Sequence, residues 1–101
     1  MINIVAILEV NDSDAFEEFE TQAIALLRKH NGVLNTAFEV KPSDSSSGAV
    51  EEVHCIEFPT TEDFDNYRAD PALQALSELR AKAISHTKVY VSGKHKNYYR
   101  H

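Results

Sequence analysis

The stretch VAILEVNDSDAFEEF at residues 5–19 decides the fold, because VHCIEFPTTEDFDNY at residues 53–67 repeats its pattern. The two segments keep valine, glutamate and phenylalanine in register at a separation of 48 residues. Each is an apolar run followed by a turn rich in helix-capping side chains and by the start of an amphipathic helix. The pattern predicts a duplicated strand–helix unit.

The remaining elements alternate around these two copies. We expect strands over residues 2–10, 33–41, 50–58 and 87–93, from apolar runs, β-propensity and alternation. In the second strand, one face is predicted to carry Leu34, Thr36, Phe38 and Val40. Residues 42–48 are predicted to form a flexible hairpin loop, because they are all proline, serine, aspartate or glycine.

Two helical regions complete the pattern. The first follows the capping residues 11–14 and ends at Asn31 and Gly32. Its apolar stripe is Phe16, Phe19, Ala23, Leu26 and Leu27, and the side chains expected to face water are Glu17, Glu18, Glu20 and Arg28. The second begins at Thr60 or Thr61 and is expected to break at Asp70 and Pro71, since proline suits a first helical position.

The order β-α-β-β-α-β indicates a ferredoxin-like α+β fold: a four-stranded antiparallel sheet with helices on one face. We expect the first and third strands to lie side by side, and parallel, in the middle of this sheet. The first strand is apolar on both faces, with Val5 and Ile7 opposite the side that meets the helices. A strand buried on both faces needs a second cover, which predicts a homodimer packed through the open sheet face near Val5, Ile7, Val53 and Cys55.

Composition limits the classes of function. At 101 residues the chain is large enough for one core, predicted over residues 1–93, with a basic and aromatic tail at 94–101. Residues 1–93 carry seven basic against sixteen acidic residues, which disfavours nucleic acid as a ligand. The short apolar start of the chain predicts neither a signal peptide nor a membrane span, and the single Cys55 excludes an internal disulfide, so a cytoplasmic location is expected.

Several segments resemble the DUF1330 family of the dimeric α+β barrel superfamily. They are residues 53–60, 67–71 and 76–80, together with 9–12 and 89–93, and the resemblance covers residues 2–93. It implies the ferredoxin-like fold and the dimer, but no established activity. Relatives in the superfamily include cofactor-independent monooxygenases and isomerases. The sequence departs from the family at Tyr67, Leu73 and Phe38, where the family tends to have tryptophan, tyrosine and an Arg-Gly-Gly-like turn.

Two glutamates are the first candidates for chemistry. By the repeat, Glu9 and Glu57 hold equivalent positions and are expected together at the strand ends on one face. Two carboxylates held close raise one pKa, which would give an acid–base pair. The alternative is a pair of solvated strand ends or ion pairs with the dimer partner.

His54 is the second candidate. It alternates with Ile56 and Phe58 and is expected in the layer between sheet and helices beside the small Ala6. There it is either a catalytic base or a hydrogen-bonded core histidine. Tyr67 and Arg80 are expected to line the same gap, either as substrate-binding groups or as half-buried packing residues.

No metal or cofactor site is predicted, because the histidines form no His-x-His or Glu-x-x-His pattern and all three glycines are isolated. Cys55 is expected to be a small buried hydrophobe, and His30 to neutralise the end of the first helix. Two functions remain open: a cofactor-independent enzyme, monooxygenase-like or isomerase-like, acting on a small aromatic or polyketide-like molecule, or a non-enzymatic dimeric module that binds a small molecule or regulates a neighbour.

Overall fold

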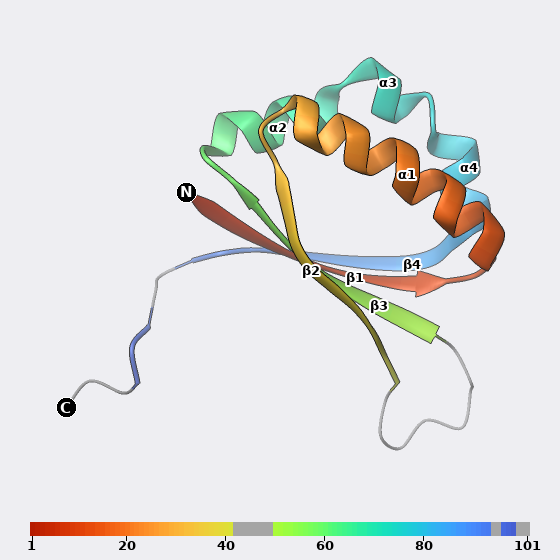
Figure 1. Cartoon of the computed structure of the whole chain (residues 1–101), viewed down its shortest axis with the longest axis horizontal. Helices are drawn as coiled ribbons and strands as arrows, with labels where there is room; N and C mark the ends of the chain where they lie inside the picture. Colours follow the sequence, from red (N-terminus) through yellow and green to blue (C-terminus); the bar gives the residue numbers. More distant parts are fainter. Residues whose placement is uncertain (42–49, 94–95, 99–101) are drawn as a thin grey trace.

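The protein forms a two-layer α+β fold in which every helix lies on one side of a single sheet (Figure 1). A computed structural model describes residues 1–41, 50–93 and 96–98; the predicted 42–48 loop and most of the 94–101 tail lie outside these ranges. The elements are β1 (Ile2–Val10), α1 (Ser13–Lys29), β2 (Val33–Val40), β3 (Val50–Phe58), α2 (Thr61–Ala69), α3 (Pro71–Gln74), α4 (Ser77–Ala83) and β4 (Ile84–Val91). The predicted ferredoxin-like class is confirmed.

The sheet has the strand order β2-β3-β1-β4, and all three pairs are antiparallel. The prediction that β1 and β3 are neighbours is confirmed, but the prediction that they run parallel is wrong. The crossover through α1 returns β2 in the direction of β1, and β3 then pairs with β2 in the opposite direction. The two copies of the repeated sequence therefore form two central strands that run in opposite directions.

Strand β2 does not keep a single face. Leu34 pairs with Ile56 on the helix side, whereas Thr36 and Phe38 pair with Cys55 and Val53 on the open side. The register shifts between Leu34 and Thr36, as at a β-bulge, which moves the following side chains to the other face. The predicted shared face is therefore wrong for Leu34, which contributes instead to the layer between sheet and helices.

Strand β4 begins at Ile84, three residues earlier than the sequence predicts. Helix α4 ends at Ala83, the next residue is already extended, and both Ala83 and Ile84 are buried. Because a buried backbone needs its hydrogen bonds satisfied, the chain passes directly from the helix into the sheet, where Ile84 pairs with Val10.

Local side chains define both ends of α1. Asp12 Oδ1 accepts a hydrogen bond from the Ala15 N–H at 3.0 Å, as an N-cap does. At the other end, the Asn31 N–H donates to the Arg28 carbonyl and the Gly32 N–H to the Leu27 carbonyl, which is a Schellman motif. Asn31 adopts the left-handed conformation that this motif requires, with φ 66°. The predicted helix stop is confirmed.

The second helical region breaks at Asp70, as predicted, and breaks again before α4. Thr60 caps α2, and Asp70 Oδ1 accepts from the Ala72 N–H at the start of α3. The region is therefore a series of short helices that lies beside α1 on the same side of the sheet (Figure 1).

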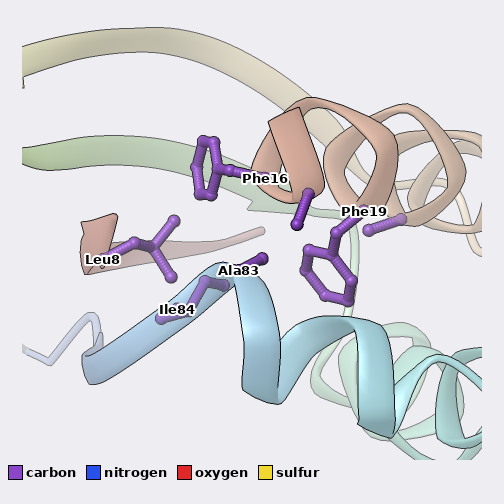
Figure 2. Packing of buried hydrophobic residues seen from close by; sticks show 7 residues of the cluster. Leu8, Phe16, Phe19, Ala83 and Ile84 are labelled. Carbon is purple, nitrogen blue, oxygen red and sulfur yellow. The ribbon is translucent and has the colours of Figure 1, made fainter. Parts of the chain in front are cut away.

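Two clusters of buried side chains fix the helices to the sheet. In the first, Phe16 and Phe19 of α1 point toward Leu8 and the junction of Ala83 with Ile84 (Figure 2). The second joins Ile4 and Phe58 of the sheet to Leu27 and Phe64 of the helices. Together they hold both ends of the helical layer against β1 and β3.

The opposite face of the sheet is uncovered within the described chain (Figure 1). Its two central rows of paired residues are Thr36, Cys55, Val5 and Tyr90, and Phe38, Val53, Ile7 and Lys88. Phe38 and Tyr90 are 50% and 54% exposed, which leaves large apolar side chains in water. We call this surface the open face.

Candidate functional site

A cavity of about 470 Å³ lies between the sheet and the helices. Its floor comes from β1 and β3, and its walls come from α1, the α2–α4 region and the inner side of β4. Most of the lining is apolar, including Ile4, Leu8, Phe19, Ile24, Leu34, Ile56 and Phe64. The polar lining includes Glu20, His54, Tyr67 and Arg80. An apolar cavity with a few convergent polar groups is the usual form of a small-molecule site.

His54 lies where the sequence predicts, next to Ala6 on the sheet and inside the cavity lining. It is only 5% exposed, and both ring nitrogens face carboxylates. Nε2 donates to Glu52 Oε1 at 3.0 Å, and Nδ1 lies 3.7 Å from Glu20 Oε2. The edge of the Phe16 ring packs against the imidazole, with 6.2 Å between ring centroids. His54 is thus both a cavity residue and a hydrogen-bonded core residue.

Glu20 lines the cavity, whereas the sequence predicts that it faces water. It lies one helical turn after Phe16 and just before Ala23, so it points into the buried layer. Burial raises the pKa of its carboxyl group, and the charge of Glu52 acts in the same direction, whereas His54 and Arg80 oppose the rise. The position of Glu20 within the apolar stripe of α1 is the feature of the sequence that indicates burial. Glu52 is not predicted as a site residue, because it lies outside the repeat.

Tyr67 and Arg80 approach the same end of the cavity from α2 and α4. Burial raises the pKa of the Tyr67 phenol to about 12; the charge of Glu20 acts in the same direction and that of Arg80 against it. The Arg80 guanidinium donates to Thr87 Oγ1 at 2.9 Å, which directs it along the inner side of β4. His54, Tyr67 and Arg80 all line this one cavity.

The predicted Glu9–Glu57 pair does not form. Glu9 is opposite Glu51, whereas Glu57 is opposite Asn3 at the other end of β1. Six residues of strand separate the two positions, or roughly 20 Å. Both glutamates belong to the open face, away from the cavity, and Glu9 accepts a hydrogen bond from Ser85 at 2.6 Å. The antiparallel direction of β3 is the reason for the error.

Other candidates lie outside this site. Cys55 is partly buried on the open face. His30 ends α1 as expected, but its ring pairs with Asp70, which also accepts from Lys29 and is 6% exposed. The described residues contain no group of three or more His, Cys, Asp or Glu suited to a metal ion. None of the helices in these ranges is long and apolar enough to cross a membrane.

The class of protein is thus a ferredoxin-like α+β domain with a cavity beneath its helices and an uncovered sheet face. Residues 3–94 match the family described as "Domain of unknown function (DUF1330)", so the chain belongs to that family. A search of curated proteins finds no match.

Solved structures share the fold at low sequence identity. A protein of unknown function from Rhodopseudomonas palustris has a TM-score of 0.75 at 13% identity, covering 95% of this chain and 83% of that one. SnoaB, a cofactor-independent oxygenase from Streptomyces nogalater, has a TM-score of 0.64 at 10% identity and covers 98% and 97%. A dimeric protein of unknown function with a ferredoxin-like fold from Bacteroides fragilis has a TM-score of 0.58 at 12% identity and covers 90% and 93%.

Proposed function

We propose that this protein is a cofactor-independent enzyme that removes a proton from a small aromatic or polyketide-like molecule, in a monooxygenase-like or isomerase-like reaction. The cavity carries this proposal, because its largely apolar lining includes the interacting polar side chains His54, Glu20, Tyr67 and Arg80. A flat apolar molecule with one acidic hydroxyl or enol fits such a site. A structural neighbour, SnoaB, is a cofactor-independent oxygenase.

These polar side chains supply the groups that this chemistry needs. A base takes the proton, and the cluster around His54 contains titratable groups in a largely buried setting. The Arg80 guanidinium provides positive charge for the anion left on the substrate. The Tyr67 phenol remains protonated up to about pH 12 and can therefore donate a hydrogen bond to that anion at neutral pH.

The cavity is tested by filling it. Ala6 lies on its floor beside His54, and Ala25 is an exposed position on α1. A screen of phenolic and quinone molecules by NMR should find ligands of the wild type that Ala6→Leu no longer binds, because the longer side chain occupies the floor. Ala25→Leu is the matched control and should bind as the wild type does.

Four outcomes are informative. Equal binding by Ala6→Leu and the wild type would place the ligand elsewhere and contradict the proposal, as would the absence of any ligand. Oxygen consumption or double-bond migration in a bound ligand would support the enzyme. Binding with no turnover of any ligand would instead favour a small-molecule-binding or regulatory module.

The second part of the proposal is a homodimer formed through the open face. Two adjacent rows of paired residues cross the open face, and their central residues are apolar and only partly buried: Val5, Ile7, Val53 and Cys55. Glutamates flank these rows along β1 and β3, and β4 adds Lys88 and His86. A second copy brings the same apolar centre and the opposite charges to the same surface. The structural neighbour from Bacteroides fragilis is a dimer with this fold.

A further inference from the structure

We propose that Glu20 is the catalytic residue that faces the bound substrate and accepts its proton, and that His54, anchored by Glu52, is the positioning residue behind it. This inference rests on the proposed function and assigns its acid–base step to one side chain. Sequence reasoning gave that step to His54, whereas the contacts around the two side chains favour Glu20.

Each ring nitrogen of His54 has a carboxylate as its neighbour. Nε2 is bonded to Glu52 at 3.0 Å and Nδ1 faces Glu20 at 3.7 Å. The side chain of His54 is 6% exposed, whereas that of Glu20 is 17% exposed. An imidazole offers only two polar atoms, and here both are directed at carboxylates. A ligand in the cavity therefore meets the Glu20 carboxylate before it meets the imidazole.

The surroundings of Glu20 suit a base. Its neighbours include His54 from β3 and the Arg80 guanidinium from α4, both of which lower its pKa, as well as the Glu52 carboxylate and the Tyr67 phenol. Burial raises the pKa of Glu20 above its usual value, so its carboxylate holds a proton more strongly than a solvated glutamate does. A base is most effective when its pKa approaches the working pH.

The proton transfer balances within the site. The O–H bond of a phenol or enol breaks, its electron pair stays on the substrate oxygen, and a new O–H bond forms on a Glu20 carboxylate oxygen. The negative charge moves from Glu20 to the substrate, so the total charge of the cavity does not change. The guanidinium of Arg80, which also lines the cavity, is available to stabilise that charge.

The test uses para-nitrophenol, because its anion absorbs visible light and the neutral phenol does not. In slightly acidic solution, where the free phenol is neutral, the wild type should show the anion band on binding. A pH indicator in unbuffered solution should record no proton release from the wild type, because the proton stays on Glu20. Any anion that Glu20→Gln binds must release its proton to the solvent, since a glutamine cannot accept it. Glu18→Gln on the exposed face of the same helix is the matched control and should behave as the wild type.

His54 is tested by a measurement that requires no ligand. In His54→Gln, the pKa of the Glu20 carboxyl group, followed by carbon-detected NMR, should rise further, because the opposing positive charge is gone. A purely structural histidine would leave that titration unchanged, and an unchanged titration overturns its positioning role.

The remaining outcomes separate this inference from the proposed function. A wild type that forms the anion band while releasing the proton to the solvent, as Glu20→Gln must, overturns the assignment of Glu20 and leaves the enzyme proposal in place. A wild type that binds neither para-nitrophenol nor any phenol of the screen overturns both. An anion band that forms without proton release in the wild type, and only with proton release in Glu20→Gln, supports the assignment.

Discussion

The Oδ2 atom of Asp70 lies 2.7 Å from Nε2 of His30, which joins the end of α1 to the start of α3. The same oxygen accepts from Lys29 Nζ at 3.2 Å, and Oδ1 accepts from the Ala72 N–H at 2.8 Å. The edge of the His30 ring also packs against Tyr67, a cavity residue, at 6.4 Å between centroids. The carboxylate thus fixes the corner of the helical layer that carries Tyr67.

This corner should make stability depend on pH. Hydrogen bonds from His30, Ala72 and Lys29 lower the pKa of Asp70 from 3.8 to about 2. A lowered pKa stabilises the folded state above the unfolded value, and this stabilisation is lost as pH falls through the folded value. The wild type should lose free energy of unfolding between about pH 4 and pH 2, and Asp70→Asn should lose less over that interval.

Urea unfolding at a series of pH values measures this difference. Asp65→Asn is the control, because Asp65 forms an exposed pair with Arg68 on α2 and should contribute little. If Asp70→Asn and the wild type lose stability in parallel below pH 4, the carboxylate of Asp70 does not stabilise the corner.

Gly32 should tolerate no side chain. An added Cβ would lie 2.7 Å from the Leu27 side chain and 2.8 Å from the Phe58 ring, both of which are buried. Gly32→Ala should therefore destabilise the fold by roughly 1–3 kcal/mol through overpacking. Gly93→Ala is the matched control, since nothing lies within 4 Å of its Cβ position. Equal midpoints of urea unfolding for the two variants would contradict the close approach.

Tyr67 should ionise later than an exposed tyrosine. Its pKa of about 12 lies above the usual value of 10.0, mainly because of burial. The raised value means that its contribution to stability is lost as pH rises from about 10 toward 12. Ultraviolet titration of the native protein should show one late phenol, and Tyr67→Phe should remove that step. A wild type in which every tyrosine ionises near pH 10 would contradict the burial of this ring.

The open face should carry the dimer. Ile7 lies in its central rows, opposite Val53 on one side and Lys88 on the other. Ile7→Lys would bury an unpaired ammonium group between two sheets, which should weaken association by about 3 kcal/mol. Light scattering should show a dimeric wild type and a largely monomeric variant, with Ala25→Lys on exposed α1 as control. A wild type that stays monomeric at micromolar concentration would refute the interface.

Much of the fold could be predicted because its signals are local. The side chains of Asp12 and Thr60 cap helices through hydrogen bonds within three residues, and Asp70 with Pro71 breaks the second helical region. Alternation placed Ile4, Ala6 and Leu8 on the helix side of β1, and all three are buried. The same alternation placed His54 in the cavity layer.

Only part of the candidate site could be predicted from the sequence, because the site depends on the direction of the strands and on which helical residues are buried against the sheet. A repeat in sequence does not state which way its second strand runs, so Glu9 and Glu57 were paired although β1 and β3 are antiparallel. Charge predicted that Glu20 faces water, whereas its helical position turns it toward His54.

The sequence by itself determined the order of the elements and, on β1 and β3, the side of the sheet that each residue faces, since these follow from backbone propensity, capping and periodicity over a few residues. Only the tertiary structure decided which charged groups meet. The contact of Glu20 with His54 joins residues 34 positions apart, and it forms because packing of Phe16 and Phe19 against the sheet sets the rotation of α1. Burial then raises the pKa of a carboxylate that the sequence would leave in solvent.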